Sequence, residues 1–172
     1  MIEIIQKATQ IYRKYGSIEL DFIAGKLGVA IYEALSTKKI KEVYFPDLKA
    51  IAIVPNLDFQ ERNYLIAHAL GHHLLHRIDL HQDYINLHEN GLFGSLEIGR
   101  SERARKEKEA DLFAAYFLIP EEKLNPILSQ DWFSKSLDKV TTLAEEFQVP
   151  EELARKRLEF KNILALNNYS VC

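Results

Sequence analysis

Cysteine is almost absent from this 172-residue chain, which has a single cysteine at position 172. One cysteine can form neither an internal disulfide nor a paired-cysteine metal site, so the sequence excludes both kinds of stabilised scaffold. Such a composition is typical of proteins from a reducing compartment. The first residues, Met-Ile-Glu-Ile-Ile-Gln-Lys, show no basic segment followed by a long apolar run, so we expect no signal peptide.

Long apolar runs and an excess of basic residues are also missing. No stretch approaches the roughly 20 apolar residues that span a bilayer, so we expect no membrane segment and a cytoplasmic location. The formal net charge is −3, which gives no basic footprint for direct binding of nucleic acid. Hydrophobic residues make up 47% of the chain, which is enough for a globular protein with its own core.

The spacing of apolar residues predicts helices and short strands. Three strands are expected, at 29–34, 43–45 and 50–54, and no helix separates them, which favours an antiparallel meander. A polar stretch at 77–100 with three glycines predicts a long loop. The expected helices are 2–15, a short one ending near 28, 59–77, 101–118, a short one after 120, 137–147 and 150–166.

These elements predict an α+β fold, in which a small antiparallel sheet packs on the helix 59–77. We expect a first domain at 1–120 and a helical subdomain, 121–172, packed on it. The last two helices could form a small helix-turn-helix, but their mixed charge favours a packing role over the reading of DNA.

Two histidines, His68 and His72, lie in the expected helix 59–77. Each residue of an α-helix advances by about 100°, so side chains four residues apart point about 40° apart and can reach one metal ion. In the zinc-peptidase motif His-Glu-x-x-His, the residue after the first His is a general base. That position is Ala69 here. The sequence therefore predicts a metal-binding helix that lacks its catalytic carboxylate.

Glu107 is the best candidate for the third protein ligand that a catalytic zinc site requires beside an open position. Asp111 shares its helix face and could accept a hydrogen bond from the far N–H of a ligand histidine. Glu109 projects about 200° away from Glu107, so we expect it to face solvent. The alternative interpretation is a solvated run of charges, but the nearby histidine pair favours ligands.

Several further residues are candidates for the rim of the site. His76 lies on roughly the same face as His68 and could be a ligand, a contact of a ligand or a substrate contact; a structural or rim role is favoured. Tyr84, His88 and Tyr116 are candidates for substrate or oxyanion contacts, without a spacing argument. An extended substrate could add a strand to the sheet along 50–54.

Two stretches resemble the signature blocks of the ImmA/IrrE family of metallopeptidases. They are Ile-Ala-His-Ala-Leu-Gly-His-His-Leu-Leu-His at 66–76 and Glu-Lys-Glu-Ala-Asp-Leu-Phe-Ala-Ala-Tyr-Phe-Leu-Ile-Pro at 107–120. The order of the elements and the later segment 143–150 are similar to the family as well. The resemblance implies a zincin-like minimal metallopeptidase domain.

The same resemblance implies what the site binds and does. It implies a Zn²⁺ cofactor with His68, His72 and Glu107 as ligands and Asp111 behind them. It also implies a cytoplasmic zinc endopeptidase that cleaves a helix-turn-helix transcriptional repressor and so derepresses genes. The partner would be that protein, with no direct nucleic acid and no membrane.

Ala69 is the departure from the family, which has Glu at this position. An alanine can neither accept the proton of the attacking water nor pass it on, and such help is typically worth about 10²–10⁴-fold in rate. We therefore expect the chain to bind zinc but to cleave protein very slowly. A Glu→Ala substitution in an otherwise intact peptidase is favoured, because relaxed selection would also erode the ligands. The alternative is a natural, metal-stabilised pseudopeptidase that binds a regulator without cleaving it.

Overall fold

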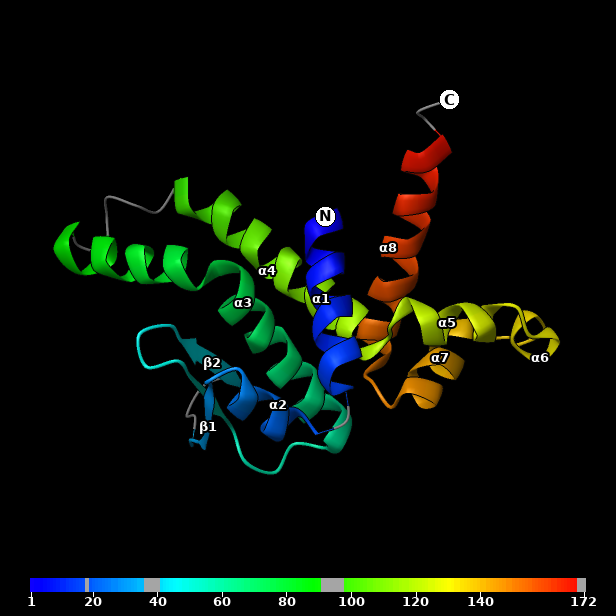
Figure 1. Cartoon of the computed structure of the whole chain (residues 1–172), viewed down its shortest axis with the longest axis horizontal. Helices are drawn as coiled ribbons and strands as arrows, with labels where there is room; N and C mark the ends of the chain where they lie inside the picture. Colours follow the sequence, from blue (N-terminus) through cyan, green and yellow to red (C-terminus); the bar gives the residue numbers. More distant parts are fainter. Residues whose placement is uncertain (18, 36–40, 91–97, 170–172) are drawn as a thin grey trace.

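In the computed structural model the backbone is described for residues 1–17, 19–35, 41–90 and 98–169, and side chains for 1–17, 19–35, 41–78 and 101–164. The described chain is mostly helical with one small sheet, so the predicted α+β class is confirmed (Figure 1). The elements are α1 (Ile2–Tyr15), α2 (Leu20–Lys26), β1 (Ala30–Glu33), β2 (Glu42–Phe45), β3 (Ala50–Ile53), α3 (Phe59–Asn90), α4 (Ile98–Leu118), α5 (Glu121–Leu128), α6 (Asp131–Ser134), α7 (Lys139–Phe147) and α8 (Glu151–Tyr169).

The sheet is mixed, and the predicted antiparallel meander is wrong in this respect. The strand order is β1-β3-β2, with β3 parallel to β1 and antiparallel to β2. The turn 46–49 joins β2 to β3 as a hairpin, closed by a 3.3 Å hydrogen bond from the Lys49 N–H to the Pro46 carbonyl. Alternating apolar residues reveal each strand but not its neighbour, and the segment between β1 and β2 is long enough to leave room for β3.

The central place of β3 overturns a second expectation. Both edges of β3 are already paired, so the segment 50–54 cannot accept a substrate strand. The edge strands of the described sheet are β1 and β2. Of these, β2 packs directly against α3, the helix that carries the histidine pair.

The helix α4 forms the centre of the core. It contacts α3, α1 and α8, and every residue from 112 to 119 is buried. A helix that is apolar on all sides is one that neighbours surround, and Figure 1 shows α4 passing behind α1 between α3 and α8. The C-terminal half of α4 therefore ties the histidine helix to the C-terminal helices.

The predicted loop at 77–100 is wrong over most of its length. The helix α3 continues to Asn90, and α4 already begins at Ile98; residues 91–97 lie outside the described part. The segment 77–90 is polar, but it contains neither glycine nor proline. Polarity alone does not stop a helix, and this segment lacks the two residues with the lowest helix propensity, so α3 continues through it.

Arg157 fastens α8 to the end of α4. The side chain is fully buried; its Nε donates a 2.9 Å hydrogen bond to the Ile119 carbonyl, and its Nη2 pairs with Glu121. The guanidinium carbon lies 3.7 Å from the centre of the Tyr116 ring, a distance at which a cation and an aromatic face attract. None of the helices in the described ranges is long and apolar enough to cross a membrane.

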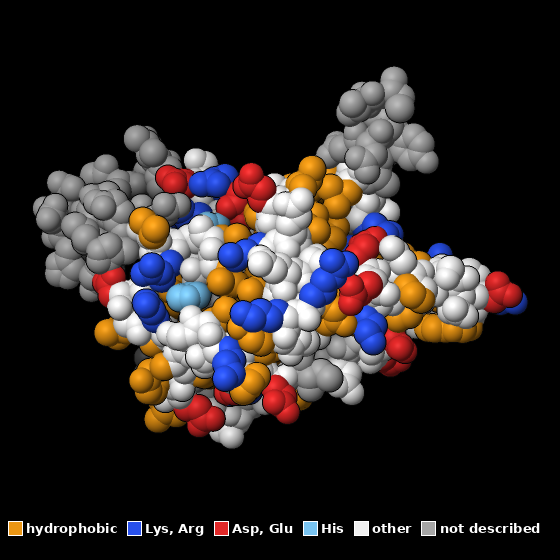
Figure 2. All heavy atoms as spheres, in the orientation of Figure 1, with side chains coloured by type: hydrophobic (Ala, Val, Ile, Leu, Met, Phe, Trp, Pro, Cys, Tyr) orange, Lys and Arg blue, Asp and Glu red, His pale blue; other side chains and the backbone are white. Residues whose placement is uncertain are grey.

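The surface charge is dispersed on the face seen in Figure 2. Basic, acidic and apolar side chains are interspersed there, without one dominant basic area. This distribution agrees with the small net charge of the sequence.

Gly71 lies where α3 and α4 approach most closely. A Cβ atom added at Gly71 would lie 3.1 Å from the Ala110 Cα, 3.2 Å from the Ala110 carbonyl oxygen and 3.3 Å from the Phe113 Cβ. Two of these atoms belong to a helix backbone and cannot swing aside. Glycine in mid-helix costs about 1 kcal/mol relative to alanine, and the contact with α4 explains why it is accepted here.

We expect Gly71→Ala to lower the free energy of unfolding by about 1–2 kcal/mol, because the strain of overpacking exceeds the gain in helix propensity. Urea unfolding of the metal-free chain measures this. Gly25→Ala is the matched control: Gly25 is exposed in α2, and an added Cβ would meet nothing within 4 Å, so the same change should be neutral or stabilising. A stabilised Gly71→Ala chain would contradict the tight approach.

Candidate metal centre

Three side chains from α3 and α4 converge on one point. His68 and His72 extend from successive turns of α3, and their Nε2 atoms lie 3.1 Å apart. From α4, Glu107 places one carboxylate oxygen 3.2 Å from His68 Nε2 and the other 3.6 Å from His72 Nε2. The three residues form a group whose potential ligand atoms all lie within 4.8 Å of one another.

The shape of this triangle fits a tetrahedral metal ion. Ligand atoms about 2.0–2.1 Å from a tetrahedral zinc ion are about 3.3 Å from each other, and the three edges measured here are 3.1, 3.2 and 3.6 Å. Two unprotonated imidazole nitrogens facing each other repel unless a cation lies between them. A proton on His68 satisfies one nitrogen, whereas a metal ion satisfies all three groups.

The centre is buried on the side of α3 and open on the side of α4. The side chain of His68 is 12% exposed, whereas that of Glu107 is 51% exposed. A catalytic metal site needs three protein ligands and one position accessible to water and substrate. The exposure of Glu107 supplies such an access route.

Asp111 contacts His68 on the side away from Glu107 and accepts three hydrogen bonds. Its carboxylate accepts from His68 Nδ1 at 3.0 Å, from the Tyr64 hydroxyl at 2.7 Å and from Lys156 Nζ at 2.7 Å. A ligand histidine whose Nδ1–H is held by a carboxylate keeps its Nε2 lone pair directed at the metal. The Asp111 cluster therefore fixes the orientation of His68, and it draws on α3, α4 and α8.

A second chain of contacts lies behind His72. Its Nδ1 is 3.2 Å from His76 Nδ1, and His76 Nε2 is 2.8 Å from a Glu109 carboxylate oxygen. The other Glu109 oxygen accepts from Arg105 at 2.9 Å. The expectation that Glu109 faces solvent is wrong, because α3 continues alongside α4 and brings His76 against a second face of that helix.

The charges of the centre are set by these contacts. Burial opposes protonation of His68, but its hydrogen bonds to Asp111 and Glu107 outweigh it and raise the pKa of His68 to about 9. Hydrogen bonds from His68 and His72 hold the pKa of Glu107 far below its usual value. Burial raises the pKa of Asp111, yet the hydrogen bonds from His68, Lys156 and Tyr64 outweigh it and lower that pKa to about 2. Without a metal, the centre keeps a proton on His68 at neutral pH.

Ala69 is fully buried on the face of α3 that meets the sheet. One turn further along, the His73 Nδ1 is 2.7 Å from the Tyr44 hydroxyl of β2. Alternation along β2 turns Glu42 to the same side as Tyr44, and its charge interacts with those of His68 and Glu107. Glu42 is thus close enough to the centre for its charge to interact with those of His68 and Glu107, and burial raises the pKa of Glu42 to about 7.

Of the remaining sequence candidates, the structure describes the side chain of Tyr116. Tyr84 and His88 belong to the part of α3 whose side chains lie outside the described residues. Tyr116 is nine residues after Glu107, about half a turn around α4 and about 13 Å along it. Its ring is buried beneath Arg157, so the structure separates Tyr116 from the metal-binding atoms.

Three residues of the centre were not found from the sequence. Tyr64 precedes His68 by one helical turn, and that spacing could have identified it. Glu42 alternates with Tyr44 on a strand, which is a weaker signal. Lys156 comes from α8, and no local pattern connects it with Asp111.

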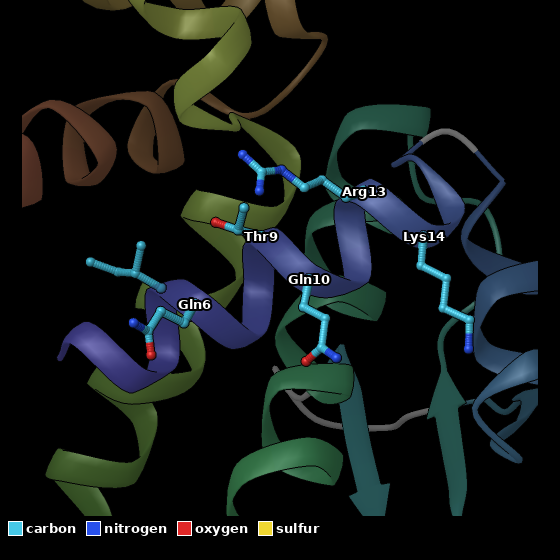
Figure 3. Close-up of a pocket in the computed structure, with 6 residues that line it drawn as sticks. Gln6, Thr9, Gln10, Arg13 and Lys14 are labelled. Carbon is cyan, nitrogen blue, oxygen red and sulfur yellow. The ribbon is translucent and has the colours of Figure 1, made fainter.

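A surface hollow of 510 Å³ lies elsewhere, along one face of α1 (Figure 3). Its lining comes from α1 alone and consists of Ile5, Gln6, Thr9, Gln10, Arg13 and Lys14. It contains no carboxylate or histidine, so it offers neither a metal site nor an acid–base pair.

Comparisons with known proteins agree with this fold. A Mycobacterium tuberculosis transcriptional regulator of known structure is similar, with 20% sequence identity and a TM-score of 0.63. The similarity covers 92% of this chain and 46% of that protein, so this chain spans less than half its length. At this identity the likeness shows a shared fold only. No curated protein matches the chain.

The family comparison is specific. The profile of the peptidase M78 family, described as the IrrE N-terminal-like domain, matches residues 24–159. That range includes the histidine pair, Glu107 and Arg157, and it confirms the resemblance to the ImmA/IrrE family. The chain therefore belongs to the peptidase M78 family, whose domain is of the metallopeptidase type.

Proposed function

We propose that this chain is the metallopeptidase domain of a zinc-dependent endopeptidase. Alanine at position 69 leaves the chain nearly inactive. The observation that carries the proposal is the triangle of two imidazole nitrogens and one carboxylate with edges of 3.1–3.6 Å. Zinc accepts imidazole and carboxylate ligands in this number and shape. The family, a peptidase family, supports a protein substrate.

The residues divide the work as follows. Zinc, when bound, polarises the scissile carbonyl and activates water. His68, His72 and Glu107 would hold it, and the exposed side of Glu107 would leave the fourth position open to substrate. Asp111 orients His68, and the ammonium group of Lys156 offsets the charge of Asp111. A further carboxylate, that of Glu42, interacts electrostatically with His68 and Glu107.

An extended substrate would reach the centre along β2. This edge strand packs on α3, and it turns Glu42 and Tyr44 toward that helix while Val43 and Phe45 are 39% and 42% exposed. Adding a strand to a free edge supplies main-chain hydrogen bonds, and exposed apolar side chains select the residues of the peptide. The route replaces the one first expected along β3.

We propose a helix-turn-helix repressor as the substrate, cleaved in the cytoplasm to derepress genes. The support is the family resemblance of the two signature blocks. A solved structure with the same fold carries the name of a transcriptional regulator, which is compatible with work on gene regulation.

The alternative function is a metal-stabilised pseudopeptidase that binds a regulator protein without cleaving it. Ala69 favours it, because the residue is fully buried, as an apolar side chain in a core is, and offers no acid–base group. The intact ligand set and the two carboxylate contacts behind it favour the enzyme, since binding alone does not require an open metal position.

We also propose that residues 1–120 form the metallopeptidase domain and 121–172 a helical subdomain packed on it. The buried contacts of Arg157 with Ile119 and Tyr116 support this division. Because Lys156 reaches Asp111, the subdomain would also support the metal centre.

Restoring the carboxylate tests the enzymatic proposal. We expect Ala69→Glu to raise the rate of repressor cleavage by about 10²–10⁴-fold, because a general base returns beside the metal. Mass spectrometry of purified repressors incubated with the zinc-loaded chain measures the products.

Ala69→Gln is the matched control, since it adds the same bulk without a base and should stay inactive. If the Ala69→Glu chain binds zinc and leaves every repressor of a broad panel intact, the peptidase proposal is wrong. A chain with Ala69 that binds the same repressors tightly would then favour the pseudopeptidase.

Zinc binding should depend on pH. The pKa of His68 is raised to about 9 in the metal-free chain, so His68 carries a proton at neutral pH that zinc must displace. The apparent affinity should therefore rise by about tenfold per pH unit between pH 6 and 8 and level off near pH 9. Competition with a chelator of known pH dependence measures it. An affinity that stays constant across this range would contradict a protonated His68.

A further inference from the structure

We propose that His76 and Glu109 form a positioning relay that selects the metal-binding tautomer of His72. The inference deepens the proposed zinc site and rests on it. It assigns a role to two residues that lie outside the group of His68, His72 and Glu107.

The relay is built from consecutive contacts. His72 Nε2 faces His68 Nε2 at 3.1 Å and Glu107 at 3.6 Å, which is the metal side. Its other nitrogen, Nδ1, is 3.2 Å from His76 Nδ1, and His76 Nε2 is 2.8 Å from Glu109. One unbroken line thus runs from the metal position through two imidazoles to a carboxylate.

The protons along this line can be arranged in one way that allows coordination. A metal-binding His72 needs a free lone pair on Nε2, so its proton lies on Nδ1 and is donated to His76 Nδ1. His76 must then carry its own proton on Nε2, which it donates to Glu109. The carboxylate accepts hydrogen bonds only, so it enforces this order.

Reversing the order shows what Glu109 prevents. A proton on His76 Nδ1 would point at His72 Nδ1, and His72 would have to carry its proton on Nε2. A protonated Nε2 cannot bind a metal ion. Glu109 therefore acts through His76 to keep the Nε2 of His72 unprotonated and able to bind a metal ion.

The burial of His76 keeps bulk water away from the relay. His76 is 3% exposed and lies between α3 and α4, so no bulk water competes for its nitrogens. Arg105 donates to the second oxygen of Glu109 at 2.9 Å and holds that carboxylate in place. His68 has a direct carboxylate partner in Asp111, so each ligand histidine has its own acceptor, one direct and one relayed.

The test compares Glu109→Ala with a matched control on the full chain. Glu102→Ala removes the same charge from the same helix and also removes a partner of Arg105, which lies 3.8 Å away. We expect Glu109→Ala to weaken zinc binding by about 10–100-fold, as loss of a contact behind a ligand typically does, and Glu102→Ala by less than about threefold. Glu109→Gln retains an acceptor oxygen and should recover part of the loss.

A second readout distinguishes a relay from simple packing. Nitrogen-15 NMR of the histidines in the zinc-loaded chain should show His76 protonated on Nε2, and Glu109→Ala should mix the two His76 tautomers. His76→Phe fills the same space without nitrogens and should weaken zinc binding as much as Glu109→Ala. If His76→Phe does not fold, Glu109→Ala still decides the matter, because the Glu109 side chain is partly exposed and its truncation disturbs the core less.

Two results would overturn the relay. Equal zinc affinity of the Glu109→Ala and Glu102→Ala chains would contradict the relay and would leave the proposed zinc site standing. A His76 tautomer protonated on Nδ1 would do the same. Failure of the parent chain to bind zinc at all would instead reject the proposed function, and the relay with it.

Discussion

The approach of α3 to α4 at Gly71 is the constraint on which the metal centre depends. Gly71 lies between His68 and His72 on one helix, and Ala110, which it touches, lies one turn from Glu107 on the other. A longer distance between the helix axes would separate the carboxylate from the imidazoles, and no ligand side chain could compensate fully. The glycine therefore helps to bring His68, His72 and Glu107 together although it carries no side chain that could bind a metal.

The centre is supported from behind by charge as well as by packing. Asp111 and Glu109, both on α4, are the terminal acceptors of the two histidine contacts. Each acceptor has a basic partner, Lys156 for Asp111 and Arg105 for Glu109, so negative charge does not accumulate without compensation. Because Lys156 belongs to α8, the C-terminal helices contribute to the electrostatics of the metal position and not only to the core.

The sequence predicted those parts of the site that lie within one helix. Helical spacing was enough to pair His68 with His72 and to place Asp111 on the face of Glu107. It could not reveal His76 with Glu109 or Lys156 with Asp111, because these pairs arise only when separate helices pack. The same limit explains the sheet, whose strands were found while their order was not. The helix α3 continues beyond its apolar pattern, because the segment 77–90 contains no glycine or proline.

At position 69 the stability of the fold and the catalysis of peptide cleavage favour different residues. Position 69 is fully buried and follows His68, whose charge interacts with that of Glu42; burial has already raised the pKa of Glu42 to about 7. A second carboxylate there would be desolvated and repelled by the first, and both effects raise a carboxyl pKa. That cost is also useful, because a base with a pKa near 7 accepts a proton best at neutral pH. With alanine at position 69 the chain avoids the cost of that charge, while His68, His72 and Glu107, the carboxylates behind them and the close helix approach all stay in place.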